Sequence, residues 1–433
     1  MRIWSQALEM AAATPPERNR YVDFLRAVSI LFVVFGHWLI ATMYYVDGDL
    51  TPGHLLESRP EMHWLTWIFQ VMPIFFIVGG YSNAVSLESA RRKNVDYAGW
   101  LAARLNRLVA PLLVVLVAWA VIAVVLNIAG VPGDTTQYVS RASLIPTWFL
   151  AIYIMVVILA PSAYQLWRRF GFLSFWMFAV LAALMDVAFF AADMEWLGWT
   201  NYFWVWLAVH QLGFAWRDGR IGGPGMLLIN AAISFIVLYL LIFKGPYPLA
   251  MVSSPDEGAS NTLPPKVTLL TLGLVQFGVL LALEGPMRRA LARTRLWAAT
   301  VLINSMIMTV YLWHMTVMAG VVAVIYYTGG FGLGVEPGTP EWWWSRPIWI
   351  GVLLIVLLPV AMSLSVFERR ARRPDAPVPS GARQIIGATM LCLGLAILAL
   401  IGYGGDAMPW LDNTAFVLVI VGAGISGLLP RLR

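Results

Sequence analysis

The chain has 433 residues, of which 60% are hydrophobic and only 12% are charged, and its mean hydropathy is +0.74. These values exclude an ordinary soluble globular domain. The net charge of +6 is spread over short basic turns instead of one domain, so it does not indicate nucleic-acid binding. The single cysteine, Cys392, excludes disulfide frameworks and cysteine-based metal sites.

Apolar segments recur along the whole chain, each close to the roughly 20 residues that a helix needs to cross a bilayer. The pattern predicts an all-α fold, a polytopic transmembrane helix bundle of about ten core spans plus two C-terminal spans. The expected spans are 24–45, 64–87, 101–128, 144–163, 171–191, 201–216, 225–243, 267–284, 299–326, 347–366, 384–403 and 413–429.

The basic residues predict how these spans are oriented. With a cytoplasmic N-terminus, all but five of the 29 lysines and arginines fall in cytoplasmic segments. The positive-inside rule then places both termini in the cytoplasm. We therefore expect a multi-pass protein of the inner or plasma membrane. The five exceptions are Arg59, Arg141, Lys244, Lys266 and Arg346.

Four segments follow from this pattern. Residues 1–20 have three arginines but no apolar core, which indicates a cytoplasmic lead-in and not a cleavable signal. Residues 21–366 form the ten-span core, 367–383 a cytoplasmic linker with three prolines, and 384–433 two additional helices. No inverted repeat is evident between the halves, which weakens a secondary-transporter interpretation.

The first span carries Arg26 and His37 on one face. They are eleven positions apart, which is three helical turns plus about 20° and about 16 Å along the axis. Arg26 is expected at the cytoplasmic edge and His37 buried midway along the span, while Asp23 can pair with Arg26 one turn away. Histidine is the natural general base near neutral pH. The alternative is a histidine that only hydrogen-bonds packed helices.

Arginines gather where the second span ends and the third begins. Arg91 and Arg92 follow the second span, and Arg104 and Arg107 share a face at the start of the third. Guanidinium groups suit phosphate oxygens. A basic cytoplasmic turn also arises from topology alone, so this pattern leaves both interpretations open.

Polar residues also occur in the predicted ninth span, 299–326. Tyr311 and His314 share a face, with Asn304 about 80° away. They are candidates for a polar cavity or for hydrogen bonds between helices. Asp186 in the fifth span either orients a histidine or borders the outer interface, and Glu284 at an inner helix end is expected to be solvated.

Five motifs in this order resemble the membrane acyltransferase 3 family over roughly residues 20–366. The arginine and histidine separated by ten residues in the first span are the most specific of them. The motifs are Asp23-Phe24-Leu25-Arg26-Ala27 with His37, Phe75-Phe76 to Gly80-Tyr81, Arg104-x-x-Arg107 with Pro111, Trp148-Phe149-Leu150, and Tyr311-Leu312-Trp313-His314.

The resemblance implies transfer of an acyl group, often acetyl, from cytoplasmic acyl-CoA to a hydroxyl of a glycan, glycolipid or small molecule. It implies His37 as the catalytic base, Arg26 as its motif partner, and Arg104 and Arg107 as ligands of the CoA phosphates. Arg91 and Arg92 are expected to assist, and no metal is implied. The expected substrate residues are His314, Tyr311, Asn304, Trp148, Tyr81 and Asp23.

Some positions depart from the family pattern. Tyr153 stands where many members have an acidic residue, Gly79-Gly80 replaces the commoner Ser-Gly, and no hydrolase-like domain follows the spans. The alternative function is a transporter or flippase that moves an anionic acylated conjugate without chemistry. The acyl group, the acceptor and the oligomeric state are not predicted.

Overall fold

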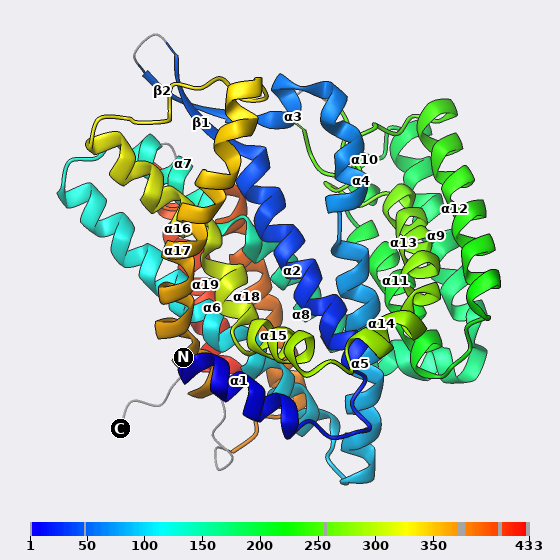
Figure 1. The fold of residues 1–433 in the computed structure, drawn as a ribbon. Helices are drawn as coiled ribbons and strands as arrows, with labels where there is room; N and C mark the ends of the chain where they lie inside the picture. The colour runs from blue at the N-terminus through cyan, green and yellow to red at the C-terminus, as the bar shows by residue number, and fades with distance from the viewer. Residues whose placement is uncertain (1, 47–48, 255–257, 371–376, 406–408, 430–433) are drawn as a thin grey trace. The chain divides into compact units, whose positions relative to one another are not determined.

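The computed structural model describes residues 2–46, 49–254, 258–370, 377–405 and 409–429, and most of these residues are helical (Figure 1). The helices are α1 (Arg2–Ala12), α2 (Arg20–Ile40), α3 (Leu55–Ser58), α4 (Thr66–Phe69), α5 (Met72–Arg92), α6 (Tyr97–Ile128), α7 (Gly133–Leu144), α8 (Pro146–Phe170), α9 (Phe172–Ala191), α10 (Glu195–Gly198), α11 (Asn201–Arg217), α12 (Pro224–Lys244), α13 (Val267–Ala282), α14 (Glu284–Ala290), α15 (Thr294–Ser305), α16 (Ile307–Tyr327), α17 (Pro340–Arg370), α18 (Gly381–Ile401) and α19 (Pro409–Ile425). A 3₁₀ helix, η1 (Pro60–Leu65), and strands β1 (Ala41–Val46) and β2 (Asp49–His54) complete the elements.

The predicted membrane-spanning fold is confirmed. Within the described residues, nine helical segments are long and apolar enough to cross a membrane, or ten if α13 and α14, which meet at a 53° bend, count as one span. The other two predicted spans coincide with α11 and α19, which have 17 residues each. A helix of that length covers about 26 Å, at the short end of the range for a membrane span.

The chain divides into two compact units. Unit 1 comprises Met1–Thr42, Thr51–Ser86 and Ala160–Ser305. Its helices pack in a continuous series, with α15 against α1 and α2, α9 against α11, and α13 against α11 and α12. The wide apolar surfaces of α9 and α12 account for much of its exposed hydrophobic area, as expected for helices that face lipid.

Unit 2 comprises Met43–Leu50, Leu87–Leu159 and Met306–Arg433. In it α16 packs on α6, α7 and α17, and α18 packs on α6, α7 and α19. The C-terminal helices are therefore integrated into this unit. Gln384 donates to the carbonyl of Ala98, and Cys392 to that of Ala151, which ties α18 to α6 and α8. Residues 371–376 of the predicted linker lie outside the described residues.

The predicted span 299–326 is not one helix. Met306, with φ −130° and ψ 20°, leaves the helical conformation and separates α15 from α16. Asn304 lies in unit 1 and His314 in unit 2. The prediction that they lie about 80° apart on one helix is therefore wrong. A single non-helical residue breaks the regular 100° step, so the directions of side chains after Met306 no longer follow from those before it.

Candidate active site

The start of α2 is fixed by a side-chain cap. Asn19 adopts an extended conformation, and its Oδ1 accepts a hydrogen bond from the backbone N–H of Tyr21 at 3.1 Å. Such a cap satisfies one of the backbone donors that a helix start leaves open. It also sets where the first turn begins and so places Asp23 and Arg26 one turn apart.

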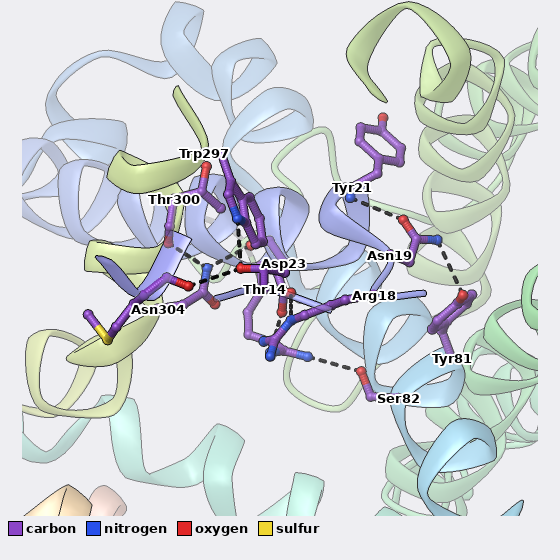
Figure 2. Close-up of polar contacts among 12 residues, drawn as sticks. Thr14, Arg18, Asn19, Tyr21, Asp23, Tyr81, Ser82, Trp297, Thr300 and Asn304 are labelled. Atoms are coloured by element: carbon purple, nitrogen blue, oxygen red, sulfur yellow. Dashed lines mark hydrogen bonds and ion pairs between the residues drawn. The ribbon is translucent and has the colours of Figure 1, made fainter. Parts of the chain in front are cut away.

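Asp23 joins two arginines in unit 1 (Figure 2). Arg18 donates through Nε to Oδ2 at 2.6 Å, and Arg26 donates through Nη1 to Oδ1 at 3.3 Å. The predicted pairing of Asp23 with Arg26 is confirmed. The hydrogen bond to Asp23 raises the pKa of the Arg18 guanidinium. Arg26 also donates through Nη2 to the hydroxyl of Ser82 at 3.0 Å, so its guanidinium links α2 to α5.

Asn304 holds α15 against this turn of α2. Its Nδ2 donates to the backbone carbonyls of Asp23 and Thr300, both at 2.9 Å (Figure 2). Its Oδ1 is buried and has no hydrogen-bond partner among the described residues. Asn304 therefore lies near the candidate site because it contacts α2.

Tyr81 and Glu284 both accept hydrogen bonds from Asn19, the residue that caps α2. Asn19 donates through Nδ2 to the hydroxyl of Tyr81 at 3.3 Å and to Glu284 at 3.4 Å. Glu284 also accepts from the indole of Trp216 and from Arg288, both at 2.9 Å. Its side chain is only 15% exposed, so the prediction of a solvated Glu284 is wrong. The reason is tertiary, because α14 folds back against the start of α2.

His37 lies in the last turn of α2 and not midway along the span. The chain becomes extended at Ala41, where β1 begins, and so the helix ends before the predicted limit at residue 45. His37 is partly buried. Beside it, a Cβ on Gly36 would lie 3.2 Å from the ring of Phe69, so α2 and α4 approach closely at this level.

In unit 2, Tyr311 and His314 lie together in the buried part of α16. Tyr311 donates its hydroxyl to the carbonyl of Pro146 at 2.7 Å, and its ring packs edge-on against Phe149. His314 Nδ1 lies 2.7 Å from the carbonyl of Tyr311, which indicates a proton on Nδ1. Trp148, next to Phe149, is partly exposed. The predicted shared face of Tyr311 and His314 is therefore observed.

The predicted phosphate-binding arginines are accessible to different degrees. Arg91 and Arg92 are exposed in the last turn of α5, and Arg107 is exposed on α6. Arg104 is partly buried, with its guanidinium 5.9 Å from the centre of the Trp100 ring. Arg107 is close enough to Glu368 for an electrostatic interaction. The structure thus leaves three of these four guanidinium groups open to a polyanion.

The model of the acyltransferase 3 family, described as an acyltransferase domain, matches residues 19–366. The chain belongs to this family. The match begins at Asn19, the cap of α2, and covers the whole segment in which the resemblance was noted. No curated protein and no solved structure matches the chain. Family membership and the helical fold together make the protein a membrane acyltransferase.

The second glycine of Gly79-Gly80, which the commoner Ser-Gly also has, is required by helix packing in this acyltransferase, whereas nothing in the structure explains Gly79 in place of serine. A Cβ on Gly80 would meet the carbonyl oxygen of His210, and a Cβ on Gly213 would meet that of Ile77. Helices α5 and α11 therefore pack backbone to backbone at this level, which only residues without side chains allow.

The sequence pattern did not single out a buried polar pair beside this crossing, His210 and Asn83. His210 Nε2 lies 3.1 Å from Asn83 Nδ2, and both residues are fully buried in unit 1. The argument that singles out His37, the cost of a polar group in an apolar helix, applies equally to them. Asn83 follows Ser82 directly, so this pair helps to fix the part of α5 that contacts Arg26.

Proposed function

We propose that this membrane acyltransferase moves an acyl group from acyl-CoA, with acetyl-CoA as the first donor to test, to a hydroxyl of a glycan, glycolipid or small molecule. The observation that supports it most is the family match over residues 19–366. Within this match, α2 presents Arg26, held by Asp23 and Ser82, on the face that carries His37.

The proposed reaction needs one base. His37 removes the proton from the acceptor hydroxyl while the oxygen attacks the thioester carbonyl. The tetrahedral intermediate then collapses, the carbon–sulfur bond breaks, and the CoA thiolate takes the proton from the imidazolium. The products are the acyl ester and CoA. A covalent acyl-enzyme intermediate is not proposed.

The proposed donor site consists of four arginines that would bind the phosphates of CoA. Arg91, Arg92, Arg104 and Arg107 would bind the CoA phosphates, because guanidinium groups pair with phosphate oxygens through charge-assisted hydrogen bonds. Arg26 and His37 are separated by about 16 Å along α2. In the proposed orientation, the Arg26 end and both termini face the cytoplasm of an inner or plasma membrane.

The test is acyl transfer in native membranes supplied with acetyl-CoA that is labelled in the acetyl group. His37→Gln should lower the incorporation of label into membrane and envelope material by about 10²–10⁴-fold, the usual contribution of a general base. His63→Gln is the matched control. His63 is a buried histidine of unit 1, and its Nε2 lies 3.1 Å from the local carbonyl of Leu56.

Full incorporation of label by His37→Gln would overturn the proposed mechanism. The donor site is tested separately, by replacing Arg104 and Arg107 with glutamate. This double change should raise the acetyl-CoA concentration needed for half-maximal rate by at least about tenfold, which corresponds to about 1.4 kcal/mol of lost binding. An unchanged requirement would remove both arginines from the donor site.

A further inference from the structure

An apolar pocket lies beside the proposed catalytic helix, within unit 1. Its volume is about 370 Å³, within the range of small-molecule sites. Four elements line it: α2, the segment from α4 to α5, α12 and α13. Its only polar lining residues are Ser29 and Gln276. An apolar cavity of this kind does not hold water stably.

The walls of the pocket are held by specific contacts. The ring of Trp67 packs edge-on against Phe235 with centroids 5.8 Å apart, and the ring of Phe32 lies 5.3 Å from that of Phe69. Gln276 donates through Nε2 to the carbonyl of Gln70 at 2.8 Å, which joins α13 to the end of α4, just before α5. The pocket is thus part of the packed structure and not a gap between loose side chains.

The mouth of the pocket faces lipid. Ile68, Phe235 and Val279 line it and are 61%, 45% and 39% exposed. All three belong to segments that are long and apolar enough to span the membrane. The mouth is therefore continuous with the surface that contacts the hydrocarbon of the bilayer, where acyl chains are the available ligand.

The pocket is elongated along the helices. On α2 it extends from Leu25 to Phe32, and on α13 from Leu272 to Leu280. These intervals correspond to about 10 and 12 Å along the helix axes. A hydrocarbon chain that runs parallel to the helices, as in a bilayer, matches this shape.

The pocket and the Arg26–His37 face occupy different sides of α2. At about 100° per residue, the residues of α2 that line the pocket point in a mean direction roughly 110° from that of Arg26 around the helix axis. The pocket also stops at Phe32, five residues before His37. An acyl group that is being transferred must reach His37, so the transferred group does not fit this position.

We infer that the pocket binds an acyl chain of a bilayer phospholipid, which packs against α2 as a resident lipid and supports the helix that carries Arg26 and His37. The catalytic part of this statement rests on the proposed function. Binding of the lipid does not, because it depends only on the pocket.

The experiment uses the full chain in nanodiscs that contain a phosphatidylcholine with a photoreactive diazirine in one acyl chain. After irradiation, peptides of α2 and α13 should carry the cross-linked lipid. Val275→Trp, which fills the pocket, should lower this labelling by about tenfold. Val237→Trp on the lipid-exposed part of α12, outside the pocket, should leave it unchanged.

Equal labelling of the α2 and α13 peptides in both variants would overturn the inference. So would labelling of these peptides by a diazirine-bearing acyl-CoA, but not by the phospholipid, since the occupant would then be the donor chain. Ser29→Leu, a smaller filling change, serves as the second variant if Val275→Trp does not fold, and should also reduce labelling. His37→Gln should lose acyl transfer but keep lipid labelling, so failure of the proposed function and failure of this inference give different results.

Discussion

Asp23 is the residue on which the contacts of the α2 N-terminus converge. Its carboxylate is 7% exposed and accepts from Arg18 and Arg26, while its backbone carbonyl accepts from Asn304. The two ion pairs differ in their exposure to solvent, because the side chain of Arg18 is 53% exposed and that of Arg26 is 25% exposed. The pair with Arg26 is the better shielded from solvent and should contribute more to stability.

Asp23→Asn should therefore lower the free energy of unfolding by about 1–3 kcal/mol, since it removes the charge that pairs with both Arg18 and Arg26. Arg18→Gln, the matched change on the exposed side, should cost less than about 1 kcal/mol. Thermal unfolding in detergent measures both. An equal loss in the two variants would contradict the ranking.

Lys266 is a buried lysine at the start of α13. It precedes α13 and is fully buried, with Nζ 3.2 Å from the centre of the Phe189 ring and no hydrogen-bond partner among the described residues. Asp186 lies nearby and accepts from Asn201, Tyr247 and the backbone of Val267. Burial lowers the pKa of Lys266 to about 8, although the charges of Asp186 and Glu195 oppose this shift.

This shift predicts a pH dependence of stability. The unfolded chain binds more protons at Lys266 than the folded chain once the pH exceeds about 8, so the free energy of unfolding should rise with pH between about 8 and 9.5. The pKa of Tyr247 is raised, and its opposing effect appears only at higher pH. Lys266→Met should abolish the rise in thermal stability, and Lys244→Met, at an exposed lysine, should preserve it. A rise that persists in Lys266→Met would assign it to another group.

At the scale of elements, the crossing of α5 and α11 is the tightest contact near the candidate site. Gly80 and Gly213 bring the two backbones together, and Phe76 stacks on Trp206 with ring centroids 4.4 Å apart. The same stretch of α5 carries Tyr81 and the Ser82 hydroxyl that binds Arg26. Packing between helices thus controls the position of Arg26, the proposed motif partner of His37.

Gly213→Ala should destabilise the protein by about 1–3 kcal/mol, because the added methyl group overpacks the backbone of α5. Gly320→Ala on α16 has open space around the new methyl group and should stabilise the protein by about 0.5–1 kcal/mol through helix propensity. Thermal unfolding of both variants gives the comparison. A neutral Gly213→Ala would mean that α5 and α11 can separate at low cost.

At the scale of the whole molecule, the number of crossings determines on which sides the termini lie. If the nine long helical segments, the bent pair and the 17-residue helices α11 and α19 each cross once, the described residues make twelve crossings. An even number puts both termini on one side, which agrees with the orientation expected from the basic residues. This agreement depends on whether the 17-residue α11 crosses the membrane.

Single cysteines test this orientation in a chain with Cys392→Ala. Met194→Cys, before α11, should react with a membrane-impermeant maleimide added to intact cells. Lys93→Cys and Arg220→Cys, which are exposed but expected on the cytoplasmic side, should react only after the cells are opened. Reaction of both Met194→Cys and Arg220→Cys in intact cells would show that α11 does not cross.

Local periodicity allowed much of this molecule to be predicted. The positions of the spans, the Asp23–Arg26 pair and the shared face of Tyr311 and His314 follow from hydrophobic pattern and helix geometry, which act over a few turns. The family match likewise falls on residues 19–366, close to the segment from 20 to 366 that its motifs predicted.

Tertiary structure alone decided where helices end and what their polar groups contact. The burial of Glu284 and the pairing of His210 with Asn83 depend on segments distant in sequence. Hydrophobic periodicity also does not indicate the break at Met306 or the end of α2 one turn after His37. A polar side chain in a span must find a partner, but the sequence states only that need. The partner depends on which helices pack together, and in this chain that includes the contact of Asn304 with α2.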